Sequence, residues 1–63
     1  MKTYKYKDLY DGYATLTVWD DGIAHLVICV RSELQLDKVY KSFRGARIAM
    51  GHWSDTWSLI KTA

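Results

Sequence analysis

The feature that most constrains the fold is a pair of strand-forming segments separated by a three-residue turn sequence. Residues 13–19 (YATLTVW) and 23–30 (IAHLVICV) are rich in β-branched and aromatic side chains, which favour extended strands. Between them lies Asp-Asp-Gly at residues 20–22, and its glycine can adopt the positive φ angle that such a turn needs. The pattern predicts an antiparallel hairpin over residues 13–30.

The length of the turn decides which side chains share a face of this hairpin. If residues 20–22 all belong to the loop, as in a type I turn closed by a glycine bulge, Trp19 faces Ile23. Three pairs then share one wholly apolar face, namely Val18–Ala24, Leu16–Leu26 and Ala14–Ile28. A two-residue Asp-Gly turn would instead set Val18 opposite His25 and would mix polar with apolar side chains. We therefore expect the three-residue loop.

Two further segments alternate in the manner of strands. Tyrosines alternate with lysines between residues 4 and 10. This pattern predicts an edge strand whose lysines disfavour pairing with the edge of another sheet. The segment 56–61 (TWSLIK) predicts a short C-terminal strand. The second face of the hairpin, which includes Tyr13, Trp19 and Val27, is too apolar to be plainly solvated, so we expect part of it to be covered.

Residues 34–53 are compatible with two interpretations. In the first, a strand over 34–40 is followed by Ser42 as the N-cap of a helix over about 43–53. In the second, Asp37 caps a longer helix whose apolar stripe runs through the whole segment. Apolar spacing favours the longer helix, whereas capping favours the strand, and a strand here also avoids a long loop. We expect the strand followed by the helix.

The chain is short, and its single cysteine leaves it without an intramolecular disulfide. A chain of this length buries only about 60% of the surface that it would expose when unfolded. We expect one compact domain, residues 1–63, of the α+β class. Its small antiparallel sheet has three to five strands with the central hairpin 13–30, and one helix of about 43–53 packs on one face. A homodimer formed through the second face or an edge strand would add burial.

The start of the chain lacks the features of a targeting segment. Met1 is followed directly by Lys2, and the longest apolar run is 26–30, which is too short for a signal-peptide core or a transmembrane helix. We expect a complete intracellular gene product that acts in the cytoplasm and does not bind membranes.

No group of residues has the spacing of a catalytic or metal-binding motif. His25 and Cys29 share a strand face but lie about 13 Å apart at the rise of a strand, too far for a nucleophile and its base or for joint metal ligation. Asp20 and Asp21 are explained by the turn, and the glycines are too dispersed for a phosphate-binding loop. We expect a non-enzymatic protein with no catalytic residues, no metal and no cofactor.

The basic segment, residues 38–52, is the strongest candidate for a binding surface. It contains no Asp or Glu and has a basic residue at every third position from its start, namely Lys38, Lys41, Arg44 and Arg47. Residues three apart on a helix rotate by about 60°, so Arg44 and Arg47 stay neighbours whereas Lys38 and Arg47 do not. Adding the residue types enriched at interfaces, the predicted partner-binding residues are Arg44, Arg47, Lys41, His52, Trp19 and Trp53.

Binding to another protein is the function that these observations predict. Charge is uneven, because residues 1–30 hold three lysines against four aspartates and residues 31–63 hold six basic against three acidic residues. A small, proline-free chain without a catalytic signature is typical of accessory or phage-encoded regulators and inhibitors, so we expect an unidentified protein partner with an acidic surface.

The alternative is a nucleic-acid-binding protein that uses the basic segment and exposed aromatic side chains. The sequence motifs of the common DNA- and RNA-binding modules are missing. The formal net charge of +2 also gives little long-range attraction for a polyanion. We therefore expect the protein partner in preference to the nucleic acid.

Overall fold

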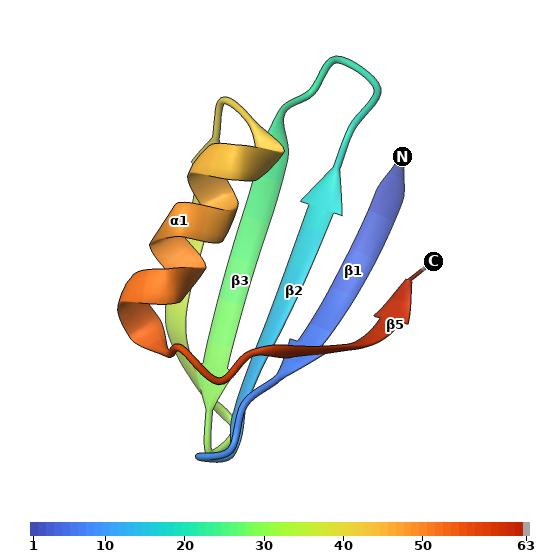
Figure 1. Ribbon diagram of the computed structural model, residues 1–63. Helices are drawn as coiled ribbons and strands as arrows, with labels where there is room; N and C mark the ends of the chain where they lie inside the picture. The colour runs from blue at the N-terminus through green and yellow to red at the C-terminus, as the bar shows by residue number, and fades with distance from the viewer. Residues whose placement is uncertain (63) are drawn as a thin grey trace.

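The computed structural model describes residues 1–62, which form a five-stranded antiparallel sheet with one helix across it (Figure 1). Along the chain the elements are β1 (Lys2–Lys7), β2 (Gly12–Val18), β3 (Ala24–Val30), β4 (Glu33–Tyr40), α1 (Phe43–Trp53) and β5 (Ser58–Thr62). The strand order across the sheet is β4-β3-β2-β1-β5. The predicted α+β class is confirmed, with the hairpin in the sheet centre and the helix on one face.

The hairpin of β2 and β3 has the register that the three-residue loop predicts. Val18 pairs with Ala24, and the other two predicted pairs follow along the strands. The loop is closed by hydrogen bonds from the Trp19 N–H to the Ile23 carbonyl at 2.9 Å and from the Gly22 N–H to the Trp19 carbonyl at 3.0 Å. Gly22 has a φ of 92°, a conformation that glycine adopts without strain. Turn length therefore sets which side chains β2 and β3 direct into the core.

The strand followed by the helix is also confirmed. β4 ends at Tyr40, and the Ser42 hydroxyl accepts a hydrogen bond from the Gly45 N–H at 3.0 Å, which is the N-cap of α1. The helix ends at Trp53. Capping thus outweighed the apolar spacing that favoured one longer helix.

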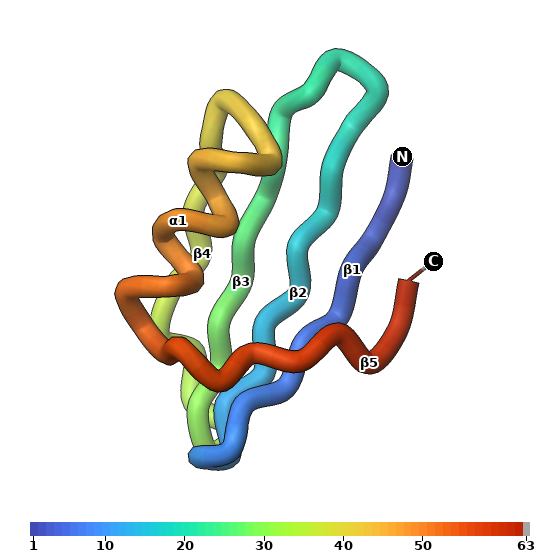
Figure 2. The backbone as a smooth tube through the Cα atoms, in the orientation of Figure 1, coloured from blue at the N-terminus to red at the C-terminus, as the bar shows by residue number. Residues whose placement is uncertain are grey.

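The prediction that residues 4–10 form an edge strand is wrong in two respects. β1 stops at Lys7, and it lies inside the sheet, between β2 and β5. Figure 2 shows how this arises, because the chain after α1 passes beneath the helix and returns alongside β1. The edges are β4 and β5, and alternation along β1 carried no information about the distant segment that pairs with it.

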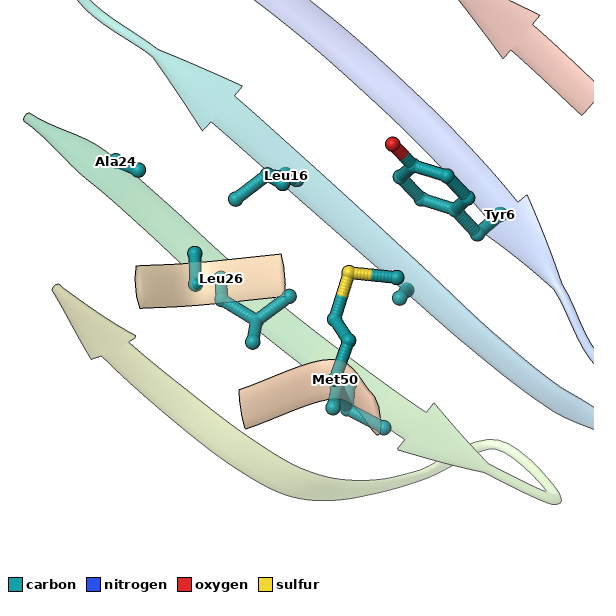
Figure 3. Packing of buried hydrophobic residues seen from close by; sticks show 8 residues of the cluster. Tyr6, Leu16, Ala24, Leu26 and Met50 are labelled. Atoms are coloured by element: carbon teal, nitrogen blue, oxygen red, sulfur yellow. The ribbon is translucent and has the colours of Figure 1, made fainter. Parts of the chain in front are cut away.

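The hydrophobic core lies between α1 and the central strands. Its buried members are Tyr6, Ala14, Leu16, Ala24, Leu26, Ile28, Ala46 and Met50. Figure 3 shows Met50 reaching from the helix across the sheet, with Leu26 and Leu16 beside it. Ala46 is fully buried on the same helix face, and its small side chain lets the helix backbone approach the strands. Each large buried side chain contributes about 1.5–3 kcal/mol of transfer free energy.

The second face of the sheet, opposite α1, is not covered by any element of residues 1–62 (Figure 1). The cover that the sequence predicts for part of this face is therefore not supplied by the described residues. Tyr13 remains 49% exposed and Val39 59% exposed there. The helix lies on the other face, because Ala46 and Met50 anchor it there.

Truncation of Leu26 should be among the most damaging core changes, because this side chain is fully buried near the centre of the sheet. We expect Leu26→Ala to lower the free energy of unfolding by about 2–5 kcal/mol. Urea denaturation followed by far-UV circular dichroism measures the change. Leu9→Ala removes the same atoms from an exposed side chain and should change the free energy by less than about 0.5 kcal/mol. Equal effects of the two variants would contradict the placement of the core.

A buried carboxylate closes the turn between β1 and β2. Asp8 Oδ1 accepts hydrogen bonds from the backbone N–H of Gly12 at 2.6 Å and of Tyr10 at 2.9 Å. A Cβ atom on residue 12 would lie 2.7 to 2.8 Å from this carboxylate, closer than real Cβ contacts come. The turn therefore requires a residue without a side chain next to Asp8.

Alanine substitutions at two glycines should act in opposite directions. We expect Gly12→Ala to lower the free energy of unfolding by about 1–3 kcal/mol, because the Asp8 carboxylate must move. Gly51 lies in α1, and a Cβ added there meets nothing within 4 Å. Gly51→Ala should therefore raise the free energy of unfolding by about 0.5–1 kcal/mol, because alanine loses less conformational entropy than glycine in a helix. Thermal unfolding of the two variants measures both changes. A Gly12→Ala protein as stable as the wild type would refute the close contact.

Candidate functional site

The basic segment is divided among three elements and does not form one stripe. Lys38 lies on β4, Lys41 lies in the link before α1, and Arg44 and Arg47 lie on the helix. The ammonium of Lys38 sits 5.4 Å from the centroid of the Tyr40 ring on its own strand. The four basic residues therefore come from a strand, a link and a helix, and the helical spacing applies only to Arg44 and Arg47.

The Arg47 side chain contacts two residues within the fold, Tyr6 and Met50. Its guanidinium carbon lies 5.0 Å from the centroid of the Tyr6 ring, and Nη1 donates a hydrogen bond to the Met50 sulfur at 3.7 Å. Burial raises the pKa of the Tyr6 phenol, and the nearby Arg47 charge acts against that rise. Arg47 thus links α1 to Tyr6 on β1. Of the predicted arginine pair, Arg44 is the one that faces outward on the helical wheel.

The two predicted tryptophans lie on opposite faces and at opposite ends of the molecule. Trp19 precedes the hairpin loop and packs against His25, with ring centroids 6.2 Å apart. Trp53 is the last residue of α1, at the end of the sheet far from that loop (Figure 1). A single partner of ordinary size therefore cannot use both as neighbouring anchors. Trp53 is the one that stands beside a concave surface.

The Trp53 hollow is a surface depression of about 350 Å³ at the end of the sheet that carries the β3–β4 turn. Its lining residues come from β3, β4, the turn between them and the helix end, namely Val30, Arg31, Glu33, Gln35 and Trp53. Trp53 is 47% exposed, so much of its ring is available to a ligand. Four of these five residues were not predicted as site residues, since they meet Trp53 only through the packing of α1 on β3 and β4.

The turn that brings Arg31 to the hollow has an unusual backbone. Arg31 has a φ of 53° and Ser32 a φ of 66°, and Val30 pairs with Glu33 directly across them. Positive φ at both central residues is the geometry of a type I′ turn, which normally selects Asn-Gly. Arginine and serine adopt it at a cost. The Arg31 N–H donates to the Asp11 carbonyl at 3.2 Å, and this contact helps to fix the turn.

The helix end beside the hollow is held by hydrogen bonds to one carbonyl. The Met50 carbonyl accepts hydrogen bonds from the Ser54 N–H at 3.2 Å and from the Trp57 indole N–H at 2.8 Å. These bonds satisfy a carbonyl that the helix end leaves unpaired. Trp53 is therefore presented from a fixed helix terminus, and the hollow is a preformed feature.

Polar groups away from the hollow form a pair on the second face of the sheet. There His25 and Asp37 lie side by side, with Nε2 and Oδ1 2.5 Å apart. The described residues contain no group of three or more His, Cys, Asp or Glu that could hold a metal ion. Within residues 1–62, no helix combines the length and the apolar character needed to cross a lipid bilayer.

Comparison with known proteins finds no family model, no curated protein and no solved structure that matches the chain. The candidate site is therefore defined by the chain's own residues, and the Trp53 hollow is the site that they define best.

Replacing Arg47 should reveal its structural role. We expect Arg47→Met to lower the free energy of unfolding by about 0.5–1 kcal/mol, because the cation–π contact with Tyr6 is lost. The pKa of Tyr6 should rise further, because the positive charge that opposes the effect of burial is gone. Chemical denaturation and an NMR titration of the tyrosine ring carbons measure the two effects. Arg44→Met is the matched control, and a Tyr6 pKa that shifts equally in both variants would rule out this role.

Proposed function

We propose that this chain is a small non-enzymatic binding protein that recognises another protein through the Trp53 hollow. The observation that carries the proposal is the juxtaposition of exposed Trp53 with Arg31 around a preformed depression. Tryptophan and arginine are among the residues most enriched at the energetic centres of protein interfaces, which tend to be pockets of this kind.

The lining of the hollow indicates what the partner presents. Val30 and the ring of Trp53 offer apolar surface, whereas Arg31 and Glu33 supply one positive and one negative charge. An apolar or aromatic side chain of the partner would enter the hollow, and a neighbouring carboxylate would meet the Arg31 guanidinium. This matches the acidic partner surface expected from the basic second half of the chain.

The fixed backbone around the hollow supports a binding role. The β3–β4 turn holds two non-glycine residues at positive φ, and such strain often occurs at sites where it positions a functional group. The helix end that carries Trp53 is tied to Trp57 through the Met50 carbonyl. Preformed sites lose less entropy on binding, which favours recognition by so small a surface.

The remaining predicted residues have unequal roles in this proposal. His52 precedes Trp53 on α1 and extends the surface of the hollow. Arg44 lies in the first turn of the same helix, about 14 Å along the axis from Trp53, so it does not. Lys41 lies at the far end of α1, and Trp19 on the other face, so neither joins the hollow. Regulation or inhibition of the partner, by occupying its surface, is the proposed role.

The cytoplasm is the proposed compartment. The chain has a single cysteine, so no intramolecular disulfide supports its small core, as is usual in a reducing environment.

Binding to nucleic acid is less well supported by the geometry. Lys38 and Arg47 each lie over a tyrosine ring of the same protein, and these tyrosines are therefore occupied on that side. The positive groups of the basic segment are spread over β4, the following link and α1. These positive groups therefore do not form a continuous row that could contact successive phosphates of a nucleic acid.

Selection from a random peptide library displayed on phage tests the proposal while the partner is still unidentified. We expect enriched peptides to combine an apolar or aromatic residue with an acidic neighbour. Synthetic copies should bind Trp53→Ala and Arg31→Glu proteins at least about tenfold more weakly than the wild type, a loss of about 1.4 kcal/mol or more. Fluorescence anisotropy of labelled peptides measures the affinities.

The controls are the same kinds of substitution at residues that lie outside the hollow. Trp19→Ala removes an exposed tryptophan from the other face, and Lys41→Glu reverses a charge at the far end of α1. Both should bind the peptides with the affinity of the wild type. Peptides that bind the Trp53→Ala and Arg31→Glu proteins unchanged would show that the hollow is not the binding site.

A further inference from the structure

The second face of the sheet carries a row of cross-strand partners that is acidic at one end and basic at the other. Asp37 on β4 pairs with Val27 on β3, Val27 pairs with Thr15 on β2, and Thr15 pairs with Lys5 on β1. Lys5 in turn pairs with Lys61 on β5, so the basic end of the row has two lysines. Because these residues are direct cross-strand partners, they lie side by side on one face. One end of this row is therefore acidic, the other end is basic, and its centre is uncharged.

This row is the middle one of three that cross the uncovered face. The row on the side of the hairpin loop runs through Val39, His25, Thr17 and Thr3, and the other row contains Cys29 and Tyr13. Tyr13 and Val39 are about half exposed, so apolar surface extends on both sides of the middle row. A face of this composition gains free energy when it is removed from water.

We propose that a second copy of the chain packs against this uncovered face, with a two-fold axis parallel to the strands between β2 and β3. Such an axis exchanges β4 with β1 and β3 with β2. Asp37 of one copy then lies over Lys5 of the other, and the symmetry produces this ion pair twice. Val27 of one copy lies over Thr15 of the other, so the centre of the contact contains no charge.

Charge complementarity selects this arrangement over the other face-to-face dimer. An axis perpendicular to the strands would place β4 over β4 and would set Asp37 against Asp37, and Lys5 against Lys5. Like charges in direct contact oppose association. The gap between two stacked sheets is about 10 Å, and aligned sheets cross at about −30°. The middle row is displaced least by that rotation, so its pairing is the most secure.

Asp37 can pair with His25 of its own copy and with Lys5 of the second copy at the same time. Its Oδ1 pairs with His25 Nε2 within the same copy, and the second carboxylate oxygen remains for the lysine of the other copy. The side chain of Asp37 is 55% exposed, and Lys5 is exposed as well. The His25 contact fixes the direction of the carboxylate, which lowers the entropic cost of the new ion pair.

The area of the face indicates a weak dimer. Strands of seven residues are about 23 Å long, and four strands are about 19 Å wide, so the projected area is about 440 Å² per copy. Two copies together bury about 900 Å² if both faces are treated as flat, without the added area of projecting side chains. This is near the lower limit of specific interfaces, which is about 1,000 Å². A dissociation constant of about 1–100 μM is therefore expected.

The dimer goes beyond the proposed function and leaves the Trp53 hollow open. The hollow is formed by α1 with the β3–β4 turn, on the side of the sheet that faces away from the second copy. A dimer would present two such hollows. A partner with two acidic, apolar segments could then be held at both ends.

Sedimentation velocity over a range of protein concentrations tests the inference. The wild type should shift from monomer to dimer, and Asp37→Lys and Lys5→Asp should each weaken the dimer by at least about tenfold. The double variant exchanges the two charges and should return to within about threefold of the wild type. Recovery in the double variant is the outcome that places Asp37 against Lys5.

The control for net charge lies on the same strand. Glu33→Lys changes the charge as Asp37→Lys does, but Glu33 lines the Trp53 hollow on the helix side, so the dimer should be unchanged. A wild type that stays monomeric at every concentration would overturn the inference. A dimer that is insensitive to Asp37→Lys would also overturn it, since it would place the contact at a strand edge or on α1. Far-UV circular dichroism confirms that each variant is folded.

Discussion

The packing of α1 on one apolar face of the β2–β3 hairpin is the contact on which the rest of the structure depends. Leu16, Leu26 and Ile28 are fully buried on that face, and Ala46 and Met50 are the helix residues that cover it. A chain this short can form one such interface and little else. Because the helix is committed to this face, the second face of the sheet remains uncovered by residues 1–62.

Two of the basic side chains that suggest a binding surface are instead arranged over tyrosine rings. Arg47 covers Tyr6, and Lys38 lies over Tyr40. Such contacts give the long cationic side chains a stabilising role within the fold. The surface that best fits a partner lies where elements meet, around the Trp53 hollow, and it combines an exposed ring, a charged rim and a constrained turn.

Much of the fold could be predicted because its signals are local, whereas the site could not. Ser42 marks the start of α1 by its hydroxyl, and the turn at residues 20–22 sets the hairpin register. The turn at Arg31 and Ser32 gave no such signal, because neither residue is the glycine or asparagine that positive φ normally selects. Trp53 was predicted as a binding residue from its type, but its neighbours across the hollow were not.

The sequence by itself determined the strands, the helix and the residues that share each face, because side-chain alternation, turn length and capping act between residues close in the chain. Only the tertiary structure decided that β5 lies beside β1, that Trp53 and Arg31 line the same hollow, and that Asp37 and Lys5 lie in the same row. These relations depend on pairing between distant segments. Such pairing is set by the burial of the whole core, and no local pattern encodes it.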